Sequence, residues 1–210
     1  MLGQFDAAYN RNDIEDMRVN AYASYQLNGG MGCVNVFVSK NPVFFDHTFN
    51  PSLLDSKLPT LTGPSMGYAL ADEFAKFMDH MLQNCLHQAE LVSQVFVPGI
   101  GAMTHFMDKV FEDSITEYLT AVVTAAKSRE GLVIYLHTLA TSVYSCAQLV
   151  NMLARNPYHV EIDQDKLKDK IKELFLPYVP TYVDLELEHL RKKFKKELDK
   201  WDKRVCCCES

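Results

Sequence analysis

Apolar residues recur at alternating intervals of three and four along the middle of this chain. Such spacing places one apolar stripe on one face of a helix, where it can pack against a partner. The pattern predicts three long helices in succession. Their stripes are Leu70, Phe74, Phe77, Met81, Cys85, Ala89, Val92 and Phe96; then Phe106, Val110, Leu119, Val122 and Ala126; then Leu132, Leu136, Leu139, Val143, Cys146, Val150 and Leu153.

Helix-ending residues separate the three stripes. We expect Ser65, after Pro64, to cap the first helix near Met66, because a serine hydroxyl can accept from the free amides of a first turn. The later breaks fall at Pro98-Gly99, Gly131 and Asn156-Pro157. Short links between long helices give antiparallel neighbours. The sequence therefore predicts an all-α fold, an antiparallel array of about five or six helices.

Two further helices are expected near the carboxyl end. One runs from Asp163 to Leu176, and Pro177 and Pro180 separate it from a last helix. Thr181 is placed to cap that helix, with Asp184 three residues on as the reciprocal partner. The apolar stripe of this last helix is Leu187, Leu190, Phe194, Leu198 and Trp201.

The first sixty residues are less regular. We expect one helix from about Phe5 to Leu27, ending at Asn28-Gly29-Gly30, with Ile14, Met17, Ala21 and Tyr25 facing inward. Cys33 to Val38 is β-branched, but a helix is favoured because a lone strand has nothing to pair with. A proline-bounded aromatic loop follows from Asn41 to Ser52. The expected division is residues 1–64 for this region, 65–204 for the helical bundle and 205–210 for a cysteine-rich tail.

Composition narrows the classes of function. The 210 residues are 48% hydrophobic, enough for a sizeable core, and the net charge of −6 argues against nucleic acid as a partner. We expect neither a signal peptide nor a membrane-spanning helix, and single apolar cysteines fit a reducing compartment. These features predict a cytoplasmic protein.

The candidate catalytic and metal motifs are weak. Gly63-Pro64-Ser65-Met66-Gly67 matches the nucleophile elbow of α/β hydrolases, but that motif needs a strand feeding a turn within a parallel sheet. Glu186 and His189 form a single Glu-x-x-His pair, whereas a di-iron bundle needs two pairs and two more glutamates. His80 and His87 lack a third ligand. We therefore expect no enzyme, no cofactor and no metal site.

Two charged features suggest contacts with other molecules. Asp108, Glu112, Asp113 and Glu117 fall on neighbouring turns of one helix and could face a basic partner; the alternative is a solvated helix face. The last helix holds Arg191, Lys192, Lys193, Lys195 and Lys196, which suit a membrane-proximal basic surface.

The final residues have the frame of a lipidation signal. Cys207-Cys208-Glu209-Ser210 matches the C-a-a-X pattern for prenylation, with Cys206 and Cys208 as further acylation candidates. One lipid chain holds a protein only marginally, so a basic surface nearby is the expected companion. Against this, Glu209 occupies a position that the pattern gives to an aliphatic residue. The alternative is an unmodified tail.

Three stretches together resemble the exocyst Sec-ten subunit and its fungal relative recyclin. They are Val36-Phe37 with the N-P-V-F-F-D-H-T-F-N-P loop, the F-V-P-G-I-G turn, and the helix E-D-S-I-T-E-Y-L, and the likeness extends from about Met17 to Trp201. A carboxyl-terminal C-a-a-X box favours the recyclin branch. Members of this family are several times longer, and the F-box of recyclin has no counterpart before Met17.

The resemblance implies a non-catalytic helical rod that tethers vesicles in exocytosis or endosomal recycling. It also implies other exocyst or tethering subunits as partners, a Rab-type small GTPase, and peripheral contact with a vesicle, endosome or plasma membrane. The alternative function is a small lipidated helical adaptor or regulator that does not tether by itself.

Overall fold

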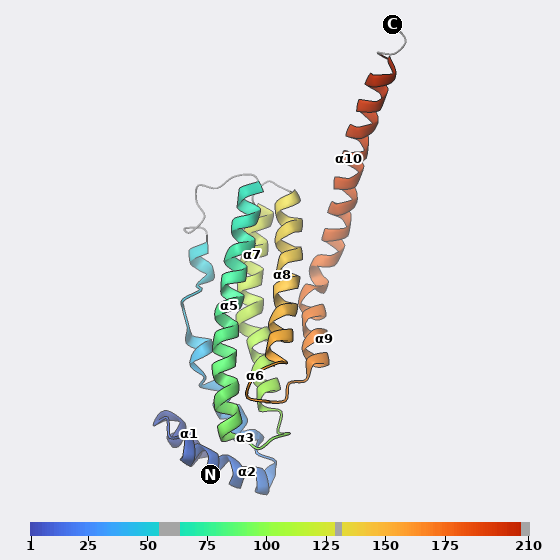
Figure 1. Ribbon diagram of the computed structural model, residues 1–210. Coiled ribbons are helices and arrows are strands. Elements are labelled where there is room, and N and C mark those ends of the chain that lie inside the picture. Colours follow the sequence, from blue (N-terminus) through green and yellow to red (C-terminus); the bar gives the residue numbers. More distant parts are fainter. Residues whose placement is uncertain (55–63, 129–131, 207–210) are drawn as a thin grey trace.

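The computed structural model describes residues 1–54, 64–128 and 132–206, and within these ranges the regular elements are all helices. The main body consists of α5 (Pro64–Val95), the continuous run α6 (Ala102–Val110), η3 (Phe111–Ile115) and α7 (Thr116–Ser128), and α8 (Leu132–Leu153). Next come α9 (Gln164–Phe175), the short turn η4 (Leu176–Tyr178) and α10 (Val179–Cys206). These rods alternate in direction along the chain, which confirms the predicted antiparallel all-α bundle (Figure 1).

The amino-terminal helices form the base of the bundle. α1 (Leu2–Asn10), α2 (Ile14–Asn28) and α3 (Met31–Ser39) lie at the end of the body where α5 finishes (Figure 1). The single helix expected from Phe5 to Leu27 is wrong, because Asn12 adopts a left-handed conformation with φ of 55° and breaks it. Asp13 then caps α2 by accepting from the Asp16 amide at 3.1 Å. Met17 and Ala21 are buried as expected, whereas Tyr25 is exposed.

Aromatic rings join the base to the bundle. Phe37 of α3 contacts Phe96, which follows α5, at 5.5 Å between ring centroids and Phe106 of α6 at 6.4 Å. Phe5 of α1 adds a further contact to Phe96. The helix expected for Cys33 to Val38 is confirmed within α3. The core therefore runs without interruption from the base into the main body.

The proline-bounded segment runs along the side of α5 (Figure 1). It contains two short 3-10 turns, η1 (Pro42–Phe45) and η2 (Pro51–Leu53), capped by Asn41 and Asn50. The Asn41 amide donates to Gln88 of α5 at 2.7 Å, and both side chains are buried. Phe49 packs against Phe77 and Tyr118, so this segment bridges α5 and α7.

Several predicted helix ends differ from the observed ones. Ser65 lies inside α5, which begins at Pro64, so it is not the residue before the first turn. Thr181 likewise lies within α10, which begins at Val179. Proline is tolerated in a first turn, because the amide that it lacks has no partner there, and Pro180 is therefore accommodated. Asp163 does cap α9, accepting from Lys166 at 3.0 Å.

α8 bears on the expectation that the chain has no membrane-spanning helix. By length and composition, Leu132–Leu153 is apolar enough to cross one. In the structure it packs against α5, α7 and α9, and half of its most apolar window is buried. A helix at the centre of a bundle is also apolar around much of its circumference, so length and composition alone do not distinguish it from a membrane-spanning helix.

Candidate functional site

α10 leaves the body and carries an apolar stripe away from it. Its first turns contact the bundle through Tyr182 and Leu185, and the helix then rises past the ends of α7 and α8 (Figure 1). Leu187 and Leu190 are 46% and 39% exposed, and exposure reaches 68% at Phe194. Large apolar residues in a row on a helix surface usually mark an interaction site. Leu198 and Trp201 extend this exposed row.

The five basic residues singled out on α10 are all exposed. Lys192 and Lys196 lie on the side of the helix opposite the apolar stripe, as the 3.6-residue period places them. The Lys192 ammonium pairs with Glu188 at 2.5 Å, and this hydrogen bond lowers the pKa of the Glu188 carboxyl. Arg191 lies at the edge of the stripe, and Lys193 and Lys195 lie farther from it, at equal angles on opposite flanks. Membrane contact by these five residues stays a prediction.

The predicted lipidation sites fall at the edge of the described chain. Cys206 is the last residue of α10, while Cys207 and Cys208 lie outside the described residues. Cys33, Cys85 and Cys146 are buried free thiols. Burial raises the pKa of the Cys85 and Cys146 thiols to about 12, which suppresses the reactive thiolate. Lipidation of the tail stays a prediction.

Two of the four acids singled out from the sequence contact α9. Asp108 pairs with Lys166, and Glu112 pairs with Lys170 at 2.6 Å. Asp113 pairs with Lys109, one turn away on the same helical run, at 2.6 Å. The basic groups that meet Asp108 and Glu112 therefore belong to the chain itself. Contact of this acidic set with another protein stays a prediction.

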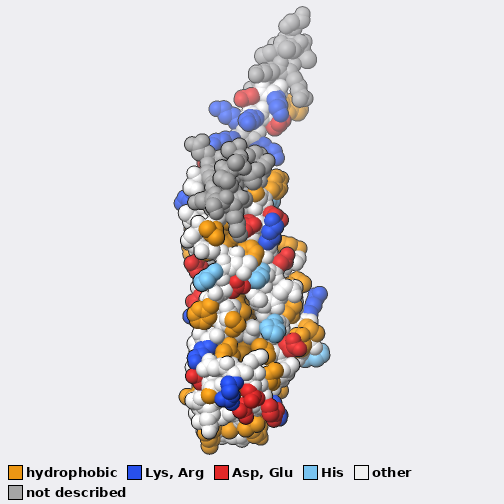
Figure 2. Space-filling view, turned by 90° about the vertical axis from the view of Figure 1, so that its left-hand side faces the viewer, with side chains coloured by type: hydrophobic (Ala, Val, Ile, Leu, Met, Phe, Trp, Pro, Cys, Tyr) orange, Lys and Arg blue, Asp and Glu red, His pale blue; other side chains and the backbone are white. Residues whose placement is uncertain are grey.

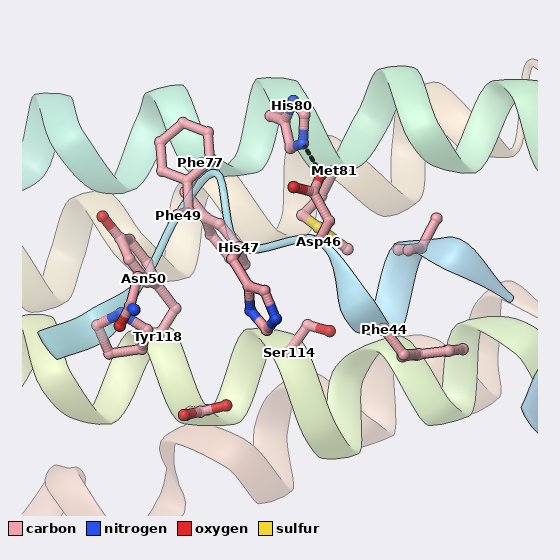
Figure 3. Close-up of a pocket in the computed structure, with 13 residues that line it drawn as sticks. Phe44, Asp46, His47, Phe49, Asn50, Phe77, His80, Met81, Ser114 and Tyr118 are labelled. Atoms are coloured by element: carbon pink, nitrogen blue, oxygen red, sulfur yellow. Dashed lines mark hydrogen bonds and ion pairs between the residues drawn. The ribbon is translucent and has the colours of Figure 1, made fainter. Parts of the chain in front are cut away.

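The fourth acid, Glu117, lines a cavity of about 200 Å³ under the proline-bounded segment. His80 of α5 contacts Asp46 there, with 2.6 Å between Nε2 and Oδ2 (Figure 3). The Thr48 hydroxyl and the His80 ring both donate to Asp46 and lower the pKa of its carboxyl to about 2. His47 and Ser114 face each other across the cavity (Figure 3). Hydrophobic and histidine side chains also lie on this side of the body, partway along it (Figure 2).

This cavity was not predicted from the sequence. The only local signal was Asp46 with Thr48 two residues on, a common turn pattern. His80 and His87 were considered together, but His80 contacts Asp46 and Asn84, while His87 is exposed. The Asp46–His80 pair joins residues 34 positions apart, which helical periodicity cannot foresee.

The π-helical turn η3 adds a second unpredicted feature beside the cavity. The Thr116 hydroxyl donates to the Phe111 carbonyl at 2.6 Å, five residues back, which matches the wider turn. Such turns often occur at functional positions. Here the turn contains Glu112, which pairs with Lys170 of α9, and Ser114, which lines the cavity.

The catalytic and metal motifs do not gain structural support. The residues described include no strand, so the strand-turn-helix setting of a nucleophile elbow is absent from them. Over the same ranges, no group of three histidine, cysteine, aspartate or glutamate side chains is placed to hold a metal. Glu186 and His189 lie one turn apart on α10, outside the bundle core.

Comparison with known proteins identifies the family. Residues 1–205 match the model for "Exocyst complex component Sec10-like, alpha-helical bundle". The chain belongs to this Sec10-like family. Its helical-bundle description agrees with the fold, and it confirms the family resemblance that the sequence indicated.

Two curated relatives agree with this assignment at low identity. The chain is 23% identical over 198 residues to exocyst complex component 5 of Dictyostelium discoideum, covering 93% of this chain and 20% of that protein. It is 21% identical over 201 residues to exocyst complex component 5 of Drosophila melanogaster, covering 96% and 24% respectively. The chain therefore spans about a fifth to a quarter of each relative. No solved structure matches.

Proposed function

We propose that this Sec10-like chain is a non-catalytic helical module of a vesicle-tethering factor that acts in exocytosis or endosomal recycling. The observation that carries the proposal is the family match over residues 1–205. The exposed apolar faces of the bundle agree with it. A module of this kind works by presenting rigid helix surfaces to other subunits. It needs no reacting side chains.

One such surface is the groove between α5 and α8. Its floor includes Met78, Leu82 and Leu149, and Tyr144 and Met152 stand at its edge with 64% and 51% exposure. Tyrosine and methionine are enriched in the cores of protein interfaces. An amphipathic helix can lay its apolar side in such a groove. The proposed occupant is a helix of another exocyst-type subunit.

The remaining partners follow from the family and from the charged faces. A Rab-type small GTPase is proposed because tethering requires recognition of a vesicle. Peripheral contact with a vesicle, endosome or plasma membrane is proposed through the exposed cations of α10, which anionic lipids attract at about 1 kcal/mol each near a membrane. The chain would then act in the cytoplasm, at membrane surfaces.

Affinity purification with mass spectrometry tests the proposal. The tagged chain should enrich exocyst-type subunits, and Tyr144→Glu with Met152→Glu should reduce that enrichment by about tenfold or more, because two charges would enter an apolar contact. Leu27→Glu, at an exposed apolar residue of α2, is the matched control and should change nothing. Recovery of no tethering subunit by the wild-type chain would refute the proposed function.

A further inference from the structure

The apolar stripe of α10 faces away from the body of its own chain. The helical period places Tyr182, Leu185 and His189 on one side of α10, and these residues are partly buried near the bundle. Leu187, Leu190, Phe194, Leu198 and Trp201 follow the other side and are exposed. The described part of the chain leaves this stripe uncovered. A partner could lie along it without meeting the bundle.

We propose that the stripe is covered by α10 of a second copy of this chain, in an antiparallel pair. A two-fold antiparallel pair brings together residues that are equally distant from its centre along the helix. With the centre at Phe194, the two Phe194 side chains meet, Leu190 comes level with Leu198 of the second copy, and Leu187 with Trp201 of the second copy. One register therefore matches large apolar residues with each other in successive layers.

The charges beside the stripe suit the same register. Lys193 and Glu197 lie on one flank, and in this register Glu197 stands about 3 Å along the axis from Lys193 of the second copy, within reach of an ion pair. Glu197 now pairs with Lys200 at 2.6 Å, but both side chains are more than half exposed, so this pair exchanges readily.

The position of the bundles allows this pairing. Each body lies on the side of α10 away from the stripe, so the two bodies lie outside the helix pair. Because the helices are antiparallel, the bodies also lie toward opposite ends of it (Figure 1). A second copy can therefore approach the stripe from the side away from the bundle.

A lipid surface fits the stripe less well than a second helix does. A helix lying in a membrane interface needs cations at the edges of its apolar face, where they reach the headgroups. Here Lys192 and Lys196 are on the opposite side, and the edges of the stripe carry Arg191 on one flank and the acidic Glu197 on the other. Mixed charges at the edge favour a partner with complementary charges, and a second α10 supplies them.

Sedimentation of the full chain under reducing conditions tests the proposal. The wild-type chain should change from monomer to dimer over roughly a hundredfold range of concentration. Phe194→Glu with Leu198→Glu should leave it monomeric with unchanged helix content by circular dichroism. Lys192→Glu, on the opposite side of α10, is the matched control and should still dimerise.

Charge exchange tests the register. Lys193→Glu alone and Glu197→Lys alone each place like charges together twice in a dimer and should weaken self-association by about tenfold. An equimolar mixture of the two variants restores opposite charges only between different chains, so it should dimerise at least as tightly as the wild type. A wild-type chain that stays monomeric, a dimer that survives Phe194→Glu with Leu198→Glu, or a mixture no tighter than its components would each overturn the proposal.

Discussion

α8 and α10 carry similar apolar patterns but meet different surroundings. Both repeat large apolar residues at intervals of three and four. In α8 the repeat is largely buried, with Cys146, Leu149, Val150 and Leu153 at 2% exposure or less, whereas in α10 the repeat is open. The pattern thus predicts which face of a helix is apolar, and the arrangement of the other helices decides whether the same chain covers that face.

The largest expected difference between these helices lies in stability. Leu153→Ala should lower the free energy of unfolding by about 2–5 kcal/mol, because it leaves a cavity in a closed core. Leu198→Ala removes the same atoms from a side chain that is 63% exposed, so the change should stay within about 0.5 kcal/mol. Urea unfolding of dilute protein measures both. Similar losses for the two variants would contradict the contrast.

The proline-bounded segment, unlike the outer part of α10, is held to the bundle by a buried polar contact. Asn41→Ala should cost about 2 kcal/mol, because it removes the cap of η1 and leaves the buried Gln88 amide without its partner. Replacing both groups is less harmful than removing one. Asn41→Ala with Gln88→Met should therefore recover part of the loss. A double variant less stable than Asn41→Ala would argue against this origin of the effect.

The hydrogen bonds that Asp46 accepts from Thr48 and His80 predict a pH dependence in that segment. The pKa of Asp46 falls from 3.8 to about 2 on folding, so these hydrogen bonds stabilise the fold above pH 4, and their contribution is lost as pH falls from about 4 to 2. Since Asp46 is substantially exposed, we expect only about 1 kcal/mol after solvent screening. Unfolding at pH 6, 4 and 2.5 measures it.

The variant Asp46→Asn should lack that part of the pH dependence. Asp79→Asn, which changes an exposed residue of α5 with no ion pair among the described residues, is the matched control and should titrate like the wild type. Equal acid sensitivity of Asp46→Asn and the wild type would show that the hydrogen bonds of the Asp46 carboxylate do not hold the segment.

The sequence was sufficient for the parts of the fold that depend on local periodicity. The stripes of α5, α7 and α8 and the cap at Asp163 were read from residues within a few turns of each other. The break at Asn12 was missed because the apolar positions continue across it and the left-handed backbone has no apolar signature.

The candidate site was less predictable because it depends on contacts between distant elements. Lys170 meets Glu112 and His80 meets Asp46 only after α9 and the proline-bounded segment have docked. The same holds for α10: its stripe was predicted residue by residue, but its exposure depends on where the bundle ends.

The smallest expected effect is on the stability of the bundle when the outer part of α10 is removed. Ending the chain after Glu186 removes the exposed stripe but keeps Tyr182 and Leu185, the residues of α10 that pack against the core. At a concentration where both proteins are monomeric, the truncated bundle should unfold within about 0.5 kcal/mol of the full chain, because surface residues contribute little. A matched truncation before Tyr182 removes core contacts and should cost more. If both truncations were equally costly, the outer part of α10 would be supporting the bundle, and its apolar residues would not be free to bind a second molecule.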